Sequence, residues 1–105
     1  MSGRMARNKG AQGERELAGI LADELGVEIK RKLGQARDGG DDIQVDHYRL
    51  EVKRREALRM DDWCEQIEAA AGPGEWPVVV YRRNGQPWRA VVPLALLIKA
   101  MREKL

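Results

Sequence analysis

The sequence predicts an α/β domain built on a central mixed sheet, in the order helix, three strands, helix, two strands, C-terminal helix. Apolar residues recur at helical spacing in three segments and alternate with polar residues in several short ones. Val78-Val79-Val80 is an uninterrupted apolar run, typical of a strand that is covered on both faces. A chain of 105 residues has the length of one domain, so we expect a single unit over 1–105, with residues 1–8 as a candidate flexible basic arm.

The first helix is expected over about residues 8–25. Its apolar residues recur every three or four positions: Leu17, Ile20, Leu21 and Leu25. Gly26 follows where a C-terminal cap is expected. Glu14 lies three residues before Leu17, so its side chain projects from the stripe that faces the core. A carboxylate at that position suggests a functional role.

Three strands are expected next, over 27–32, 42–46 and 48–53, with a charged, glycine-containing loop at 34–40. The second and third are separated by about one residue, which predicts an antiparallel hairpin. Residues two apart on a strand share a face, so Glu51 and Lys53 stand side by side. In the hairpin, the start of one strand lies opposite the end of the other, which brings Asp42 close to this pair.

A second helix is expected over 62–71, because Asp62 and Glu65 form a candidate capping box and Gly72-Pro73 cannot continue a helix. A strand over 77–82 should follow. The connection through the helix is long enough for a parallel, right-handed crossover from the strand that contains Glu51.

The C-terminal part is predicted to form a second hairpin and a closing helix. Asn84-Gly85 is a strong tight-turn signal between the strand at 77–82 and a partner strand at 88–92. Pro93 is a favourable first helical residue, and the helix is expected to run to Leu105. Its apolar side could cover the core or form a dimer surface.

The residue inventory excludes several kinds of chemistry. The chain has one serine, no threonine, one histidine and one cysteine, so a serine or cysteine nucleophile with a histidine base has little to draw on. The single Cys64 also excludes an intramolecular disulfide and a structural zinc site. No apolar stretch reaches the roughly 20 residues of a membrane span, and the N-terminus lacks the apolar region of a secretory signal. We therefore expect no membrane partner and a cytoplasmic location, either with the nucleoid or, for a phage-encoded protein, in the host cytoplasm.

The net charge of +2 is weak evidence for a nucleic-acid partner, but basic residues gather in the first sixty positions. The convergence of Asp42, Glu51 and Lys53 is more informative. Two carboxylates beside a lysine suit a hard divalent cation such as Mg²⁺, which would polarise a scissile phosphate and lower the pKa of a bound water. Lys53 would orient that water or offset developing charge, and Glu14 is expected to reach the same metal through water.

These residues resemble a known family. Asp42 with Glu51-x-Lys53 resembles the PD-(D/E)xK nuclease motif, and the segment from Lys9 to Leu17 is similar to the opening helix of archaeal-type Holliday junction resolvases. The resemblance extends from about Lys9 to Val92. It implies a restriction-endonuclease-like core and a homodimer that uses Mg²⁺ or Mn²⁺ to place paired nicks in four-way, branched DNA.

The resemblance also implies roles for individual residues. The catalytic positions are Glu14, Asp42, Glu51 and Lys53, with Asp42, Glu51, the Val52 backbone carbonyl and, through water, Glu14 as metal ligands. Gln66 is a further candidate near the metal, although an ordinary helix-surface glutamine fits it equally well. The candidate DNA-binding residues are Arg7, Lys9, Arg15, Lys32, Arg37, Arg54 and Arg55. One departure bears on junction specificity: the family commonly has a serine before the catalytic aspartate, and here the loop reads Gly34-Gln35-Ala36-Arg37.

Three alternatives remain open from sequence. The chain could be a PD-(D/E)xK nuclease for flaps, nicks or replication intermediates, a DNA-binding module that does not cut, or a structural domain. Taken alone, Glu51 and Lys53 would read as an exposed ion pair on a strand. The three tryptophans could stack on unpaired bases, although packing is the better interpretation for Trp63.

Overall fold

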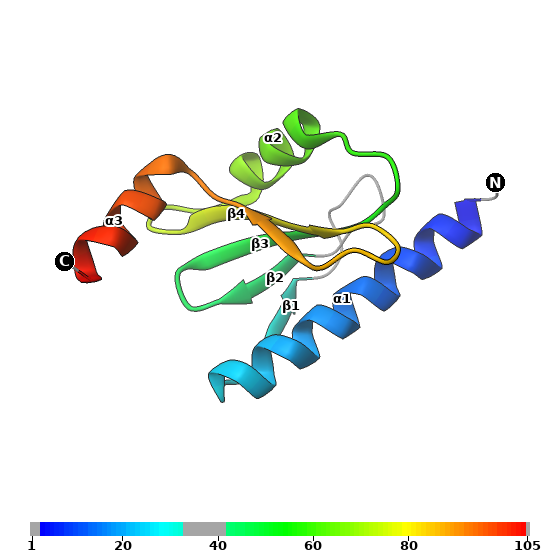
Figure 1. Cartoon of the computed structure of the whole chain (residues 1–105), viewed down its shortest axis with the longest axis horizontal. Helices are drawn as coiled ribbons and strands as arrows, with labels where there is room; N and C mark the ends of the chain where they lie inside the picture. The colour runs from blue at the N-terminus through cyan, green and yellow to red at the C-terminus, as the bar shows by residue number, and fades with distance from the viewer. Residues whose placement is uncertain (1–2, 33–41, 105) are drawn as a thin grey trace.

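The computed structural model describes the backbone of residues 3–32 and 42–104 and the side chains of residues 10–29 and 43–104. Its elements follow the predicted order (Figure 1). They are α1 (Gly3–Leu25), β1 (Lys30–Lys32), β2 (Asp42–Val45), β3 (Tyr48–Arg54), α2 (Met60–Ala70), β4 (Trp76–Arg82), β5 (Arg89–Val91) and α3 (Leu94–Lys104). The predicted α/β class is confirmed.

Within the described residues the sheet has five strands in the order β1-β2-β3-β4-β5. β3 and β4 run parallel and are joined through α2, whereas the other neighbouring strands are antiparallel. Both the predicted hairpin and the predicted parallel crossover are therefore confirmed. In parallel strands the carboxyl ends lie at the same edge of the sheet, so the last residues of β3 and β4 are neighbours there.

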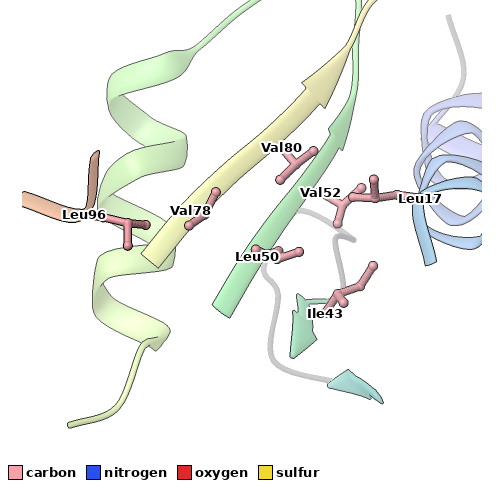
Figure 2. Close-up of a cluster of buried hydrophobic side chains, with 7 residues drawn as sticks. All are labelled: Leu17, Ile43, Leu50, Val52, Val78, Val80 and Leu96. Atoms are coloured by element: carbon pink, nitrogen blue, oxygen red, sulfur yellow. The ribbon is translucent and has the colours of Figure 1, made fainter. Parts of the chain in front are cut away.

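Helices cover the two faces of the sheet from opposite sides (Figure 1). One face carries the larger core cluster: Leu17 of α1, Ile43, Leu50, Val52, Val78, Val80 and Leu96 of α3 (Figure 2). The other face carries Trp63 and Ile67 of α2, packed with Val79. The alternation along β3 follows from strand geometry, because successive side chains point to opposite faces. Leu50 and Val52 therefore face α1, and Glu51 and Lys53 face the α2 side.

The hairpin between β2 and β3 turns through two residues, Asp46 and His47, rather than one. Val45 is the cross-strand partner of Tyr48, and Asp46 has a φ of 52°. Aspartate tolerates this left-handed conformation better than most residues. The register that follows aligns Ile43 with Leu50, so both apolar side chains enter the same core.

Several predicted boundaries were wrong. α1 begins at Gly3 instead of at about residue 8, and no apolar periodicity marks residues 3–8 in the sequence. β1 begins at Lys30 instead of Val27, because its partner β2 ends one residue beyond the Lys30–Gln44 pair and leaves nothing for Val27 to pair with. Val27 is accordingly exposed.

The predicted capping box of α2 was also wrong. The helix starts at Met60, and its N-cap Arg59 makes no side-chain cap hydrogen bond. Asp61 and Asp62 instead lie within the first turn, where carboxylates interact favourably with the positive end of the helix dipole. An oxygen of Asp62 also lies 2.9 Å from the guanidinium of Arg59.

Gly26 and Gly85 stand in the two turns that the sequence predicted after α1 and β4. Gly26 caps α1 as expected: its φ is 66°, and its N–H donates to the carbonyl of Ala22 at 2.8 Å. A side chain would be strained in that conformation. The predicted tight turn at Asn84-Gly85 is also confirmed: the Gln86 N–H donates to the Arg83 carbonyl at 3.1 Å, and Gly85 has a φ of 70°. The turn lies within a longer connection over residues 83–88. None of the described helices has the length and apolar character needed to cross a membrane.

Candidate active site

Three charged side chains are buried among the residues whose side chains the structure describes. Glu14, Glu51 and Lys53 retain exposed fractions of 2%, 4% and 3%. Burying a charge is costly unless it is paired or binds a ligand, so such residues rarely remain for packing alone. All three belong to the four positions predicted to be catalytic.

Glu51 and Lys53 form a buried ion pair. Both belong to β3 and lie two residues apart, so their side chains leave the same face. The Nζ atom of Lys53 lies 3.3 Å from Oε1 of Glu51. The alternative of an exposed ion pair on a strand surface is therefore wrong.

Trp63 of α2 packs beside the lysine of this pair. The Lys53 ammonium lies 5.9 Å from the centroid of the Trp63 ring, and that ring lies 6.1 Å from the ring of Tyr81. An ammonium over an aromatic face is attracted by the ring's negative quadrupole. The packing interpretation of Trp63 is confirmed. The same ring also contacts the environment in which the Lys53 ammonium is buried.

Asp42 is the first residue of β2, and its backbone is the direct cross-strand partner of Glu51. Directly opposite positions in an antiparallel pair share a face, with Cβ atoms roughly 4.5–5.5 Å apart. The predicted approach of Asp42 to the pair is thus confirmed at the level of the backbone register. The side chain of Asp42 lies outside the described side chains.

α1 approaches the end of β3 closely at Gly13, the residue before Glu14. A Cβ placed on Gly13 would lie only 2.7 Å from Cβ of Arg54, the residue after Lys53. One turn later Leu17 is buried in the core cluster. Glycine at 13 therefore lets α1 lie against the carboxyl end of β3, next to the site.

The candidate DNA-binding residues divide into two groups. Arg15 is exposed on α1, whereas Arg54 and Arg55 are half-buried at the end of β3. Arg54 donates a hydrogen bond from Nη1 to Oδ1 of Asn84 at 2.6 Å. The side chains of Arg7, Lys9, Lys32 and Arg37 lie outside the described side chains.

The two remaining candidates are Val52 and Gln66. The Val52 side chain is buried in the core facing α1, and its backbone carbonyl stays a predicted metal ligand. Gln66 is half-buried on α2. It therefore lies on the same side of the sheet as Glu51 and Lys53, and a place near the metal stays a prediction.

The donor set fits a hard divalent cation. The described side chains, which do not include that of Asp42, contain no group of three or more His, Cys, Asp or Glu that could hold a metal. The described part does supply buried carboxylates at Glu14 and Glu51, with the backbone of Asp42 opposite Glu51. Carboxylate and carbonyl oxygens are the ligands Mg²⁺ prefers, and Mg²⁺ needs only one or two carboxylates from a protein.

The model of the family described as "Phage putative PDDEXK endonuclease" matches residues 5–105. The chain belongs to this family. The predicted PD-(D/E)xK nuclease superfamily is thereby confirmed, and with it the restriction-endonuclease-like core. PD-(D/E)xK nucleases generally use divalent metals, and a nuclease binds DNA. No curated protein and no solved structure matches the chain.

Sequence reasoning missed three residues that shape this site: Gly13, Trp63 as a neighbour of Lys53, and Asn84 as a partner of Arg54. Only Gly13 had a local signal, because a glycine inside a helical pattern lowers helix stability and can mark a packing contact. The other two contacts depend on how α2 and the residue 83–88 connection fold onto β3.

Proposed function

We propose that this nuclease is a metal-dependent DNA endonuclease that hydrolyses phosphodiester bonds with Glu14, Asp42, Glu51 and Lys53 at its active site. One observation carries the proposal: the buried charged side chains of the described part are Glu14, Glu51 and Lys53, all three at predicted catalytic positions. A family match over residues 5–105 supports the same chemistry.

A divalent cation, Mg²⁺ or Mn²⁺, would be held by Asp42, Glu51 and the Val52 carbonyl and would supply Lewis acidity and an activated water. The chain's own groups have separate tasks. Glu51 presents a carboxylate that burial and the Lys53 ammonium hold in one position. Lys53 donates hydrogen bonds to the attacking water or to a phosphate oxygen, where negative charge grows. Glu14 offers a third carboxylate to orient water.

For the substrate we propose branched DNA, in particular a four-way junction cut by paired nicks. The support is the resemblance of residues 9–17 to the opening helix of junction resolvases. Cutting of flaps, nicks or replication intermediates is the alternative within the same chemistry. Because the matched family is a phage family, we place the protein in the host cytoplasm.

Paired nicks require two active sites, so the proposal includes a homodimer. The helix α3 offers a surface for it. Leu96 is buried in the core, whereas four other apolar side chains of this helix are exposed: Leu94, Leu97, Ile98 and Met101. Their spacing places them on one side of the helix, as expected of a contact between two copies.

The test is cleavage of a labelled synthetic four-way junction with Mg²⁺ or Mn²⁺, alongside linear duplex, flap and single-stranded DNA of equal length. Glu51→Gln serves as the blank. Symmetric nicks in the junction alone would support resolution. Cutting of several substrates would leave a broader endonuclease, and DNA binding without any cutting would overturn the proposal in favour of a binding module.

A further inference from the structure

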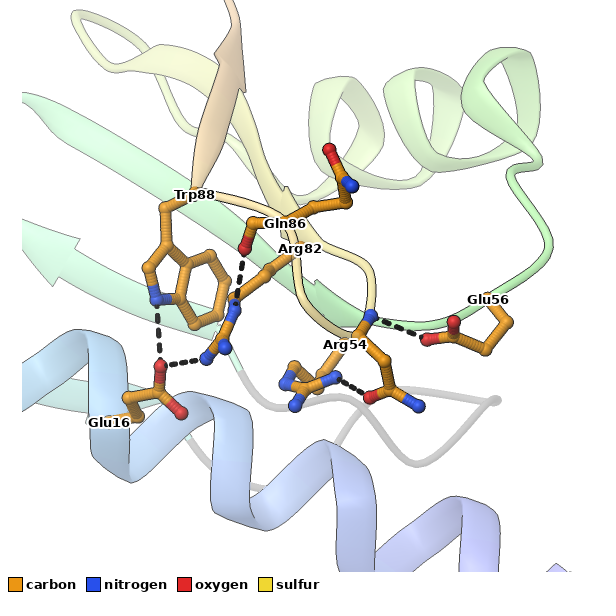
Figure 3. A network of polar contacts seen from close by, with 7 residues as sticks. Glu16, Arg54, Glu56, Arg82, Gln86 and Trp88 are labelled. Atoms are coloured by element: carbon orange, nitrogen blue, oxygen red, sulfur yellow. Dashed lines mark hydrogen bonds and ion pairs between the residues drawn. The ribbon is translucent and has the colours of Figure 1, made fainter.

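The connection between β4 and β5, residues 83–88, is tied to α1 at Glu16 (Figure 3). Nε1 of Trp88 donates to Oε1 of Glu16 at 3.0 Å, and Arg82 forms an ion pair with the same carboxylate. Glu16 lies two residues after Glu14 on the same helix. The base of the connection is thus fixed to α1 through Glu16.

A second tie joins the connection to the end of β3. Asn84 accepts the hydrogen bond from Arg54, and its own backbone N–H donates to Oε2 of Glu56 at 2.8 Å. Arg54 directly follows Lys53. Since β3 and β4 are parallel, the connection leaves β4 at the edge where β3 ends. It therefore lies beside the proposed active site.

Exposed arginines stand at both ends of this connection. Arg83 is its first residue, and Arg89 follows its last. In the sheet register Lys53 pairs with Tyr81, and Tyr81 pairs with Arg89, so the three form one row across β3, β4 and β5. Neighbouring strands lie roughly 4.8 Å apart, which puts the Arg89 backbone roughly 10 Å from that of Lys53.

We propose that the connection over residues 83–88 is a DNA-binding element in which Arg83 and Arg89 contact backbone phosphates near the bond that is cut. This inference rests on the proposed function. Guanidinium groups form bidentate, charge-assisted hydrogen bonds with phosphate. The Arg54–Asn84 bond holds the element in place, so less conformational freedom is lost when DNA binds. Arg54, predicted from sequence to bind DNA, acts here by positioning the connection through its hydrogen bond to Asn84.

The experiment measures DNA binding by fluorescence anisotropy at several salt concentrations, with EDTA present so that no DNA is cut. The test variant is Arg83→Ala/Arg89→Ala. The matched control is Arg102→Ala/Lys104→Ala on α3, which removes two exposed positive charges elsewhere. We expect the test variant to bind roughly 10-fold more weakly at low salt. Its salt slope should fall by roughly 2, because each of the two arginines would neutralise one phosphate. The control should change affinity less than roughly 2-fold.

Asn84→Ala removes the hydrogen bond between Arg54 and Asn84 without changing the net charge. It should weaken binding several-fold and leave the salt slope unchanged, because the arginines still reach the phosphates but the element is less ordered. Equal affinities for the test and control double variants would overturn the inference while leaving the proposed function intact. Wild-type protein that neither binds nor cuts DNA would overturn both.

Discussion

A Cβ atom on Gly13 would lie 2.7 Å from Cβ of Arg54, a separation that real Cβ atoms essentially never show. The helix that carries Glu14 and the strand that carries Lys53 therefore meet at a point where only glycine fits. The close approach sets where α1, and with it the buried Glu14, lies relative to the end of β3. It makes Gly13 a structural determinant of the site.

Gly13→Ala should push α1 away from β3 and impair cleavage. We expect a destabilisation of about 1–3 kcal/mol, typical of overpacking, and a loss of cleavage larger than the stability change explains, because Glu14 moves with the helix. Thermal melting and cleavage rate measure the two effects.

Gly19→Ala is the matched control, because a Cβ there meets nothing within 4 Å. Alanine is the better helix former, so this variant should gain about 0.5–1 kcal/mol and keep its activity. Equal behaviour of the two variants would contradict the proposed role of Gly13.

We expect the buried Glu51–Lys53 pair to be needed for cleavage but not to stabilise the fold. Replacing a buried ion pair by well-packed apolar residues of similar volume is often neutral or stabilising by about 1–4 kcal/mol. Glu51→Met/Lys53→Met should therefore be at least as stable as wild type in chemical denaturation and should lose cleavage. Lys53→Met alone leaves a buried carboxylate without its ammonium and should be less stable than the double variant. A double variant markedly less stable than wild type would mean that the pair is structural.

Trp63 should influence cleavage through Lys53. Trp63→Phe keeps an aromatic face near the ammonium, whereas Trp63→Leu removes it. We expect the phenylalanine variant to cut DNA faster than the leucine variant, with DNA affinity similar in both. Ile67→Val, a change in the same core cluster but not at the lysine, is the control and should cost about 0.5–1.5 kcal/mol of stability without a specific loss of rate. Equal rates for the two Trp63 variants would argue against a role for the aromatic ring.

Cys64 should react slowly with thiol reagents. Burial raises the pKa of the Cys64 thiol, and the carboxylates of Glu68 and Asp61 raise it further, because each disfavours the thiolate. The folded-state pKa thus lies above that of the unfolded chain, and alkylation by iodoacetamide should rise at higher pH in the folded protein than in the denatured one. Any stabilisation linked to this group is complete below the unfolded pKa and declines as pH rises through the folded one.

Glu68→Gln should move that alkylation profile part of the way back toward lower pH, since burial remains the larger cause. Coincident pH profiles for folded and denatured protein would refute the shift.

The hairpin of β2 and β3 was predictable because its pattern is local. Alternating apolar residues set which face each side chain takes, and a short turn leaves one register that buries Ile43 and Leu50 together. That register alone placed Asp42 opposite Glu51. The triple-valine strand and the glycine at position 26 were predictable for the same reason.

The missing parts of the prediction depend on contacts between distant segments. Nothing near Arg54 in the sequence indicates Asn84 as its partner, because thirty residues and a helix separate them. The start of α1 at Gly3 was missed because residues 3–8 carry no apolar stripe. The burial of Glu51 and Lys53 also required the structure, since a strand face with two charges reads as exposed until α2 is placed over it.

The most direct test of the account is cleavage of a labelled four-way junction by wild-type protein and Glu51→Gln, with Mg²⁺ or Mn²⁺ and after thermal melting has shown both to be folded. Wild type should cut only with the metal, and Glu51→Gln should be slower by roughly 10²-fold or more while it still binds the DNA. Cleavage by Glu51→Gln at the wild-type rate would contradict the central claim that the buried charges on β3 form the active site.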